Sequence, residues 1–266
     1  MTDFTVVIPA RFASTRFPGK PLALIGGKTM LEHVHQRALE AGASQVIIAT
    51  DDSRIENAAQ QFSADVCMTD DTHQSGTTRI AQVIALRGIS DDEIVINVQG
   101  DEPFIPPENI RQVALNLAQN PQYPMATLCY PIDNAEDAIN PNVVKVVKSD
   151  SGSALYFSRA PIPFGRGHIV QDSQGRLTIE NWPAKGMLEQ TPMYFRHIGI
   201  YGYRANFVTR FSEMQDSKLE QFESLEQLRV LERGHRIHIE VATGAPPHGV
   251  DTPEDLDRLN EQLNRS

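Results

Sequence analysis

The sequence predicts an α/β fold, a mostly parallel central sheet flanked by helices, with an inserted β-rich region. Apolar runs of strand length alternate with stretches of helical periodicity over residues 4–103. The strand-like runs are apolar throughout, as is typical of strands buried on both faces of a parallel sheet. After residue 130 several strand-like pieces follow one another, joined by irregular segments. This change of rhythm indicates an insertion into the α/β unit.

The elements of the first part follow a strict order. The apolar run FTVVIPA predicts the first strand, and Gly42 is placed to end the helix that follows it. The predicted strands lie at residues 4–10, 45–52, 64–69 and 93–103, and the predicted helices at 29–42, 53–62 and 77–88. Strands and helices that alternate at this spacing favour parallel strands with helices on both faces of the sheet.

The second part is richer in strands. Strand-like pieces lie at 124–132, 142–149, 154–164 and 196–207, and a late strand at 236–243. Residues 165–194 form a long excursion in which a small hairpin is expected. A helix is predicted around Glu226, and a C-terminal helix begins at Thr252 with Pro253 inside its first turn. We therefore expect one domain over residues 1–266, with residues 130–210 as an inserted region for sugar binding or dimerisation.

Composition excludes several classes of protein. The chain has 266 residues, a formal net charge of −10 and a pI of about 5.3. Such a surface repels nucleic acid and anionic membranes. Cys67 and Cys129 lie in apolar, strand-like surroundings, which indicates buried thiols in a reducing compartment. Neither a signal peptide nor an apolar run of membrane-spanning length is present, so a cytoplasmic protein is expected.

Polar residues follow three of the predicted strands. The first strand leads into a loop with Arg11, Arg16 and Lys20, the second ends in Thr50–Asp52, and the fourth ends in Gln99–Glu102. Taken alone, each group could consist of ordinary solvated charges or turn residues in a loop. Parallel strands bring their carboxyl ends to one edge, where cations and carboxylates together suit a polyphosphate with Mg²⁺. The chain has neither a Walker A motif nor a dinucleotide glycine fingerprint, which argues against an ATPase and a dehydrogenase.

Seven motifs in order resemble one family along nearly the whole chain. They are IPARFASTRFPGKPL at 8–22, HQSGT at 73–77, NVQGDEP at 97–103, ALYFSRAPIP at 154–163, RHIGIYGYR at 196–204, LEQLRVL at 225–231 and GVDTPEDL at 249–256. Together they resemble the CMP-KDO synthetases, which are 3-deoxy-manno-octulosonate (KDO) cytidylyltransferases of the glycosyltransferase-A-like fold. The resemblance implies that CTP and KDO give CMP-KDO and pyrophosphate for lipopolysaccharide synthesis.

The resemblance also implies roles for individual residues. Arg11 and Lys20 would contact the triphosphate, with Arg16 as a third cation, while Ser75 and Arg79 would belong to the CTP site. Asp101 and Asp251 would hold Mg²⁺, since this hard ion prefers oxygen ligands. The residues implied for the sugar acid are Gln99, Arg159, His197, Tyr201, Glu226 and Gln227. A homodimer is implied as well.

Alternatives remain open at this point. The segment between Arg159 and His197 is longer than the family pattern leads one to expect, and it holds Trp182, the only tryptophan. It is either a surface elaboration or part of the sugar pocket, and in the second case 8-amino-KDO is a possible substrate. A sialic acid cytidylyltransferase is a rival within enzymes. A non-catalytic nucleotide-binding regulator is the rival outside them, although it would have no need of both Asp101 and Asp251.

Overall fold

The computed structural model describes residues 2–13, 17–180, 182, 192–246, 250 and 252–263. Its chain divides into two compact units. Unit 1 comprises residues 1–121, 199–214 and 243–266, and unit 2 comprises residues 122–198 and 215–242. The expectation of a single domain with an insertion at 130–210 stays a prediction, and the units are described one at a time below.

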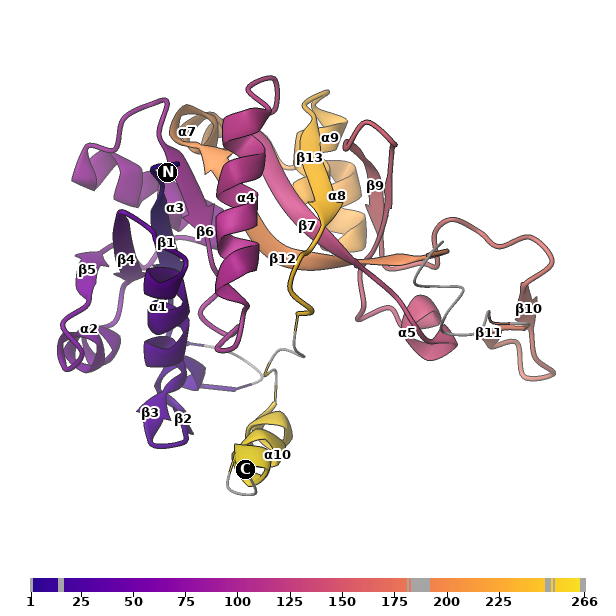
Figure 1. Ribbon diagram of the computed structural model, residues 1–266, viewed down its shortest axis with the longest axis horizontal. Coiled ribbons are helices and arrows are strands. Elements are labelled where there is room, and N and C mark those ends of the chain that lie inside the picture. The colour runs from indigo at the N-terminus through magenta and orange to yellow at the C-terminus, as the bar shows by residue number, and fades with distance from the viewer. Residues whose placement is uncertain are drawn as a thin grey trace. The chain divides into compact units, whose positions relative to one another are not determined.

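Unit 1 is built on a mostly parallel sheet, as the sequence predicts (Figure 1). The strand order is β12–β6–β1–β4–β5. β1 pairs in parallel with β4 and with β6, β4 pairs in parallel with β5, and β12 runs antiparallel to β6. The strands are β1 (Thr5–Pro9), β4 (Gln45–Thr50), β5 (Asp65–Met68), β6 (Ile94–Asn97) and β12 (Phe195–Arg204), of which Gly199–Arg204 belongs to unit 1.

Helices cover both faces of this sheet. In Figure 1, α1 and α4 lie on one face and α3 packs with α7 on the other. The helices of unit 1 are α1 (Met30–Glu40), α2 (Ser53–Gln60), α3 (Gly76–Arg87), α4 (Pro107–Gln119), α7 (Ala205–Glu213) and α10 (Pro253–Leu263). Thr29, Asp52 and Ser75 cap α1, α2 and α3, and each side chain accepts a hydrogen bond from a backbone N–H of the first turn. A short 3-10 turn, η1 (Lys20–Leu22), and the pair β2 (Leu24–Ile25) and β3 (Lys28–Thr29) precede α1.

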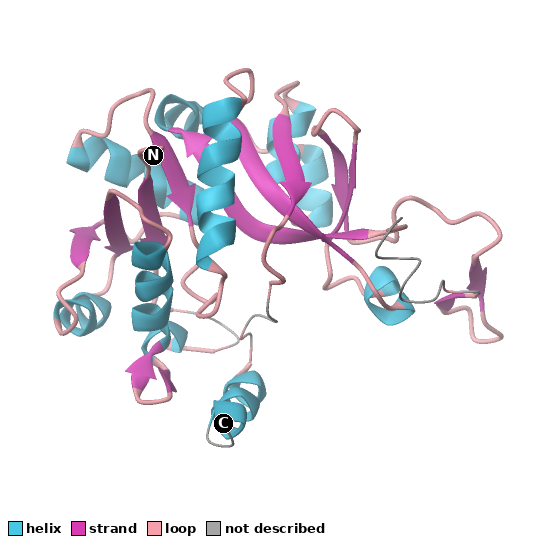
Figure 2. Cartoon of the chain, in the orientation of Figure 1, coloured by secondary structure: helices cyan, strands magenta, loops and turns pink. Residues whose placement is uncertain are grey.

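Among the described elements of unit 2, strands outnumber helices, and long loops join them (Figure 2). β7 (Met125–Pro131) pairs in parallel with β13 (Ile237–Val241). β8 (Lys145–Lys148) pairs antiparallel with β9 (Ala154–Ser158) and with the first residues of β12. The remaining elements are α5 (Ala135–Ile139), β10 (Ile169–Gln171), β11 (Leu177–Ile179), α8 (Lys218–Glu223) and α9 (Gln227–Glu232). β10 and β11 form the small antiparallel hairpin expected in the long excursion.

Two helices of unit 1 differ from the sequence reading. α4 was not predicted at all, and α7 begins at Ala205, inside a stretch that reads as the end of a strand. Apolar side chains on both helices are buried, Val113 and Leu117 on α4 and Phe207 and Phe211 on α7. These apolar residues recur at helical spacing, so a local signal was present in both stretches, and the face that they form is buried.

Gly202 allows α4 to lie directly against β12. A Cβ atom at this position would lie 2.6 Å from Cγ1 of Val113, 2.9 Å from Cδ1 of Ile96 and 3.0 Å from Cδ1 of Leu117. Branched side chains on three sides leave no direction in which such an atom can move. The helix and the strand therefore approach as closely as a glycine permits.

We expect Gly202→Ala to lower the free energy of unfolding by about 1–3 kcal/mol through overpacking. Gly199→Ala is a matched control on the same strand, because a Cβ there would meet nothing within 4 Å. Urea unfolding of both variants checks this. Equal midpoints for the two variants would show that the α4–β12 contact relaxes without cost.

Candidate active site

The carboxyl ends of β1 and β6 meet the start of α3 at one edge of unit 1. A Cβ atom on Gly100 would lie 3.1 Å from the carbonyl oxygen of Pro9, and one on Gly76 would lie 3.4 Å from Cγ of Pro9. Segments separated by more than sixty residues in the sequence thus approach so closely that a side chain on either glycine would meet Pro9. Parallel sheets place ligand sites at this edge.

Lys20 and Asp101 form an ion pair at this edge. Nζ of Lys20 donates to Oδ2 of Asp101 at 2.9 Å. Lys20 is 8% exposed, whereas the Asp101 side chain is 44% exposed. A lysine ammonium withdrawn from water needs an anionic partner, and here the partner is the predicted metal ligand. The structure thus brings together the predicted triphosphate cation and the predicted magnesium ligand.

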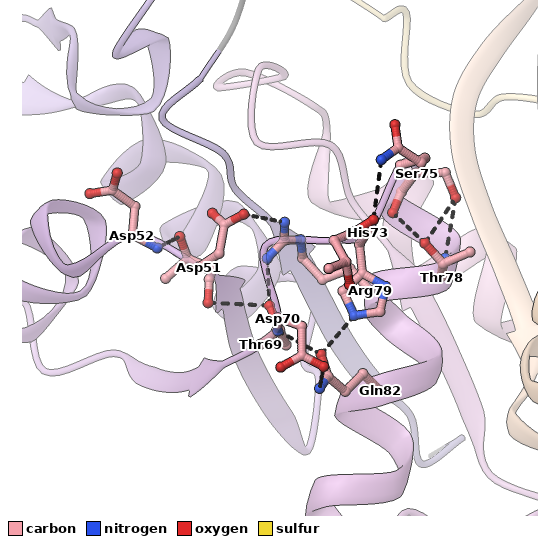
Figure 3. A network of polar contacts seen from close by, with 12 residues as sticks. Asp51, Asp52, Thr69, Asp70, His73, Ser75, Thr78, Arg79 and Gln82 are labelled. Carbon is pink, nitrogen blue, oxygen red and sulfur yellow. Dashed lines mark hydrogen bonds and ion pairs between the residues drawn. The ribbon is translucent and has the colours of Figure 1, made fainter.

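Arg79 lies at the centre of a second polar network, across the ends of β4 and β5 (Figure 3). Its side chain is fully buried and donates from Nη2 to Oδ2 of Asp51 at 2.8 Å and from Nη1 to the Thr69 hydroxyl. Nε has no hydrogen-bond partner among the described residues. Since two of its nitrogens hold Asp51 and Thr69, this guanidinium joins the two strand ends. Its role in binding CTP stays a prediction.

Hydrogen bonds to two residues of α3, Gln82 and Thr78, hold the segment between β5 and α3. His73 Nε2 lies 2.6 Å from Oε1 of Gln82, which also accepts from the Asp70 amide at 2.8 Å (Figure 3). Because Oε1 is an acceptor, the ring must carry its proton on Nε2. Ser75 ends the segment, and its hydroxyl accepts from the Thr78 amide as the cap of α3.

The other predicted residues of unit 1 lie beside these groups. Gln99 follows β6 and donates from Nε2 to Oδ1 of Asn97 at 3.4 Å, and Tyr201 is the register partner of Asn97 on β12. Arg11 follows β1 and is partly buried. Arg16 and Asp251 lie outside the described residues, so their predicted roles stay predictions.

In unit 2, Arg159 is surrounded by backbone carbonyls. Nε donates to the carbonyl of Glu223 at 2.8 Å, Nη1 to that of Pro141 at 3.0 Å and Nη2 to that of Ser224 at 3.4 Å. The described part of the chain offers this guanidinium no ion pair with a carboxylate. A guanidinium has five N–H donors, so two remain, one on each terminal nitrogen. Such a group has both the charge and the donors for a bidentate carboxylate.

Gln227 begins α9 and is 4% exposed. Its Nε2 has no hydrogen-bond partner among the described residues. A buried amide without a partner costs free energy and is rare, so it points to a polar ligand. The preceding residue, Glu226, is partly buried at the N-cap position. Unit 2 therefore brings Arg159 and the start of α9 together through Glu223 and Ser224.

His197 lies on β12 next to Thr127 of β7. Its Nε2 is 2.9 Å from the Thr127 hydroxyl, which itself donates to the carbonyl of Ile198 at 3.1 Å. Because the hydroxyl proton is used, the ring donates and carries its hydrogen on Nε2. Burial lowers the pKa of His197 to about 3. A neutral imidazole can exchange hydrogen bonds with a sugar hydroxyl but cannot neutralise a carboxylate.

The sequence gives no hint of several partners that hold these groups. Thr69 and Glu223 make the bonds described above, and Lys145 donates from Nζ to the carbonyl of Asn140 at 2.6 Å and to that of Val143. Burial and the charge of Arg159 lower the pKa of Lys145 to about 8. Only Asp51 lies in a stretch that reads as a polar strand end. Contacts to backbone carbonyls leave no motif by which a sequence could reveal them.

Comparison with known proteins agrees with this geometry. The family model described as "Cytidylyltransferase" matches residues 5–237. The chain belongs to the cytidylyltransferase family. The 3-deoxy-manno-octulosonate cytidylyltransferase of Alteromonas mediterranea is 56% identical over 98% of this chain and 100% of its own length. That of Pasteurella multocida is 51% identical over the full length of both chains. The resemblance drawn from the seven motifs is therefore confirmed.

Solved structures resemble the chain as well. A CMP:2-keto-3-deoxy-manno-octonic acid synthetase complexed with CTP is 39% identical, with a TM-score of 0.83 over 100% of this chain and 99% of that one. A cytidylyltransferase from Leptospira borgpetersenii is 14% identical, with a TM-score of 0.61 over 100% of this chain and 88% of that one. At 14% identity, that structure supports the fold alone. The predicted nucleotidyltransferase fold is thus confirmed.

We expect the imidazole of His197 to stay neutral between pH 7.5 and 5, where a histidine with an ordinary pKa near 6.5 takes up a proton. Heteronuclear NMR of the ring nitrogens, with His197→Gln for assignment, checks both the flat titration and the proton on Nε2. The unfolded ring protonates below about pH 6.5 but the folded ring only near pH 3, so acid between these values favours unfolding. A midpoint between pH 6 and 7 would contradict this environment.

Proposed function

We propose that this chain transfers the cytidylyl group of CTP to KDO, releasing pyrophosphate and forming CMP-KDO for lipopolysaccharide synthesis. The single observation that carries this conclusion is the Lys20–Asp101 pair at the edge formed by the ends of β1 and β6. It puts a cation for phosphate and a carboxylate for a metal side by side. The relatives that match the chain over its full length are cytidylyltransferases of KDO by name.

The reaction requires charge to be neutralised as it moves. The hydroxyl on C2 of the sugar acid attacks the α-phosphorus of CTP in line, the bond to the pyrophosphate oxygen breaks, and the hydroxyl proton leaves to solvent. Catalysis of phosphoryl transfer depends mainly on positioning and electrostatic stabilisation. Arg11, Arg16 and Lys20 would bind the triphosphate and then the departing pyrophosphate. Ser75 and Arg79 would lie in the part of the site that takes the nucleoside.

We propose Mg²⁺ as the cofactor. The Asp101 carboxylate is largely accessible and already faces a phosphate-binding lysine, which fits an ion that keeps several waters and takes one or two carboxylates with phosphate oxygens. Asp251 would be the second protein ligand. Among the described residues no group of three or more His, Cys, Asp or Glu side chains could hold a metal ion. In this proposal the phosphate oxygens complete the coordination. When bound, the ion would supply electrostatic stabilisation and a lowered pKa of the attacking hydroxyl.

In this proposal a charged residue binds the carboxylate of the sugar acid and neutral residues bind its hydroxyls. Arg159 would bind its carboxylate, because that guanidinium is held by neutral carbonyls alone. His197 and Gln227 would bind hydroxyls, since the imidazole is neutral and the amide has an unused donor. The remaining residues proposed for the sugar are Gln99, Tyr201 and Glu226.

We further propose a cytoplasmic homodimer. Both cysteines are buried free thiols, which suits a reducing compartment. No helix in the described part of the chain is both long enough and apolar enough to cross a bilayer. Among the described strands β9 pairs only with β8, and it carries the exposed Leu155. An apolar edge strand is normally covered, and a second copy of the chain is the partner that we propose for it.

Pyrophosphate release with CTP and Mg²⁺ tests the function directly. We expect release with KDO, none above background with N-acetylneuraminate, and loss of release when EDTA removes the metal. A higher kcat/KM with 8-amino-KDO than with KDO would instead favour the amino sugar. CTP binding without release from any of the three sugars would favour the non-catalytic regulator, and would overturn the proposal.

Two substitutions should separate the substrates. Lys20→Ala removes a phosphate contact, so we expect it to raise the KM for CTP at least about tenfold and to leave the KM for KDO within about twofold. Arg159→Ala should do the reverse, because its charge faces the sugar acid. Steady-state kinetics with each substrate varied in turn check both, and each variant is the control for the other. Equal changes in the two KM values in either variant would contradict its assigned role.

A further inference from the structure

Glu223 and Arg159 are joined by a reciprocal set of hydrogen bonds within unit 2. Oε2 of Glu223 accepts from the backbone N–H of Arg159 at 2.9 Å, and the backbone carbonyl of Glu223 accepts from Nε of Arg159 at 2.8 Å. Oε1 of Glu223 accepts from the Ser158 hydroxyl at 2.6 Å. Each residue thus binds the main chain of the other with its side chain. This arrangement fixes both the position and the rotamer of Arg159.

The same bonds hold two further segments. The guanidinium reaches Ser224, which has a left-handed backbone with φ of 52° and leads through Leu225 into Glu226 and Gln227. On its other side it reaches the carbonyl of Pro141, whose loop neighbours Asn140 and Val143 are held by Lys145. Arg159 and the start of α9, which supply three of the proposed sugar contacts, are therefore fixed to one another through Glu223.

The carboxylate of Glu223 does not form an ion pair with the guanidinium of Arg159. Both carboxylate oxygens are occupied, by the Ser158 hydroxyl and the Arg159 amide, and neither accepts from the guanidinium. A carboxylate facing the guanidinium as a bidentate pair would compete with the carboxylate of a ligand. In this geometry the glutamate orients the arginine through its backbone and leaves two N–H donors and the positive charge for a substrate anion.

We infer that Glu223 is a positioning residue for the sugar acid, acting through Arg159 and the start of α9 without touching the substrate. This inference rests on the proposed function and adds a residue to which no role in the reaction has so far been given. A preorganised guanidinium binds a carboxylate without the cost of ordering a long side chain at the moment of binding. Loss of Glu223 therefore weakens binding of the sugar acid and leaves binding of CTP unchanged.

The test is Glu223→Gln, which keeps the size of the side chain but removes its charge and leaves one acceptor oxygen where the carboxylate has two, so it cannot accept from the Ser158 hydroxyl and the Arg159 amide as the carboxylate does. We expect the KM for KDO to rise about tenfold while the KM for CTP stays within about twofold. Ser158→Ala removes the bond to Oε1 of Glu223, together with the one that the hydroxyl accepts from the Ala160 amide at 3.0 Å, and keeps the charge of Glu223, so we expect a smaller rise of about threefold. Should Glu223→Gln not fold, Ser158→Ala decides the question.

Glu232→Gln is the matched control. Glu232 also carries a carboxylate that accepts from a backbone N–H in unit 2, that of Leu219 at 3.2 Å, but it makes no hydrogen bond or ion pair with Arg159. We expect both KM values of this variant to match the wild type. A KM for KDO that is unchanged in Glu223→Gln and in Ser158→Ala, or that rises equally in Glu232→Gln, would overturn the inference.

Failure of the proposed function has a different signature from failure of this inference. If the wild-type chain releases no pyrophosphate with KDO, the proposed reaction is wrong, and calorimetric KDO binding to the wild type and to Glu223→Gln then decides the role of Glu223. Equal binding by both overturns that role, as does an absence of binding by the wild type. Weaker binding by Glu223→Gln supports it.

Discussion

The buried ammonium of Lys20 imposes a constraint on the whole of unit 1. A lysine that is 8% exposed needs an anion, and Asp101 supplies one from a loop 81 positions away in the sequence. Satisfying it requires the turn after β1 and the turn after β6 to meet, and parallel pairing of β1 with β6 makes that possible. The pair also keeps the proposed phosphate-binding charge and the proposed metal-binding charge side by side, so little reorganisation would remain for binding.

The two units treat their cations differently. In unit 1, Lys20 and Arg79 are paired with the carboxylates of Asp101 and Asp51. In unit 2, the guanidinium of Arg159 is held by backbone carbonyls. The Lys20–Asp101 pair suits a ligand that brings its own metal ion, because Asp101 would hold the ion and Lys20 would hold the phosphate. A cation on neutral carbonyls suits a ligand that arrives as a bare carboxylate. Each arrangement agrees with the substrate proposed for it.

The sequence predicts those features of the fold and the site that follow from hydrophobic periodicity and from polar residues at strand ends. The alternation through β6 and the polar turns at Lys20 and Asp101 lie where the pattern puts them, because each is a local signal repeated along the chain. α4 was missed although its signal is local, because Pro107 lies in its first turn and its buried apolar residues Ile110, Val113, Ala114 and Leu117 recur at helical spacing. The partners of Arg159 could not be predicted, because backbone carbonyls have no identity in a sequence and Glu223 looks like any charge on a helix.

Trp182, in the long segment after Arg159, is held by an aromatic contact and a hydrogen bond within unit 2. Trp182 stacks on Tyr194 with ring centroids 6.0 Å apart, and its Nε1 donates to the carbonyl of Asp133 at 3.1 Å. Tyr194 is buried in a cluster with Ile132 and Ala138, so the tryptophan packs over the core beside α5. An indole that has both a stacking partner and a hydrogen bond is satisfied by the protein itself. Trp182 therefore serves to anchor its own position in the chain on the core of unit 2, and its indole N–H is already used by the carbonyl of Asp133.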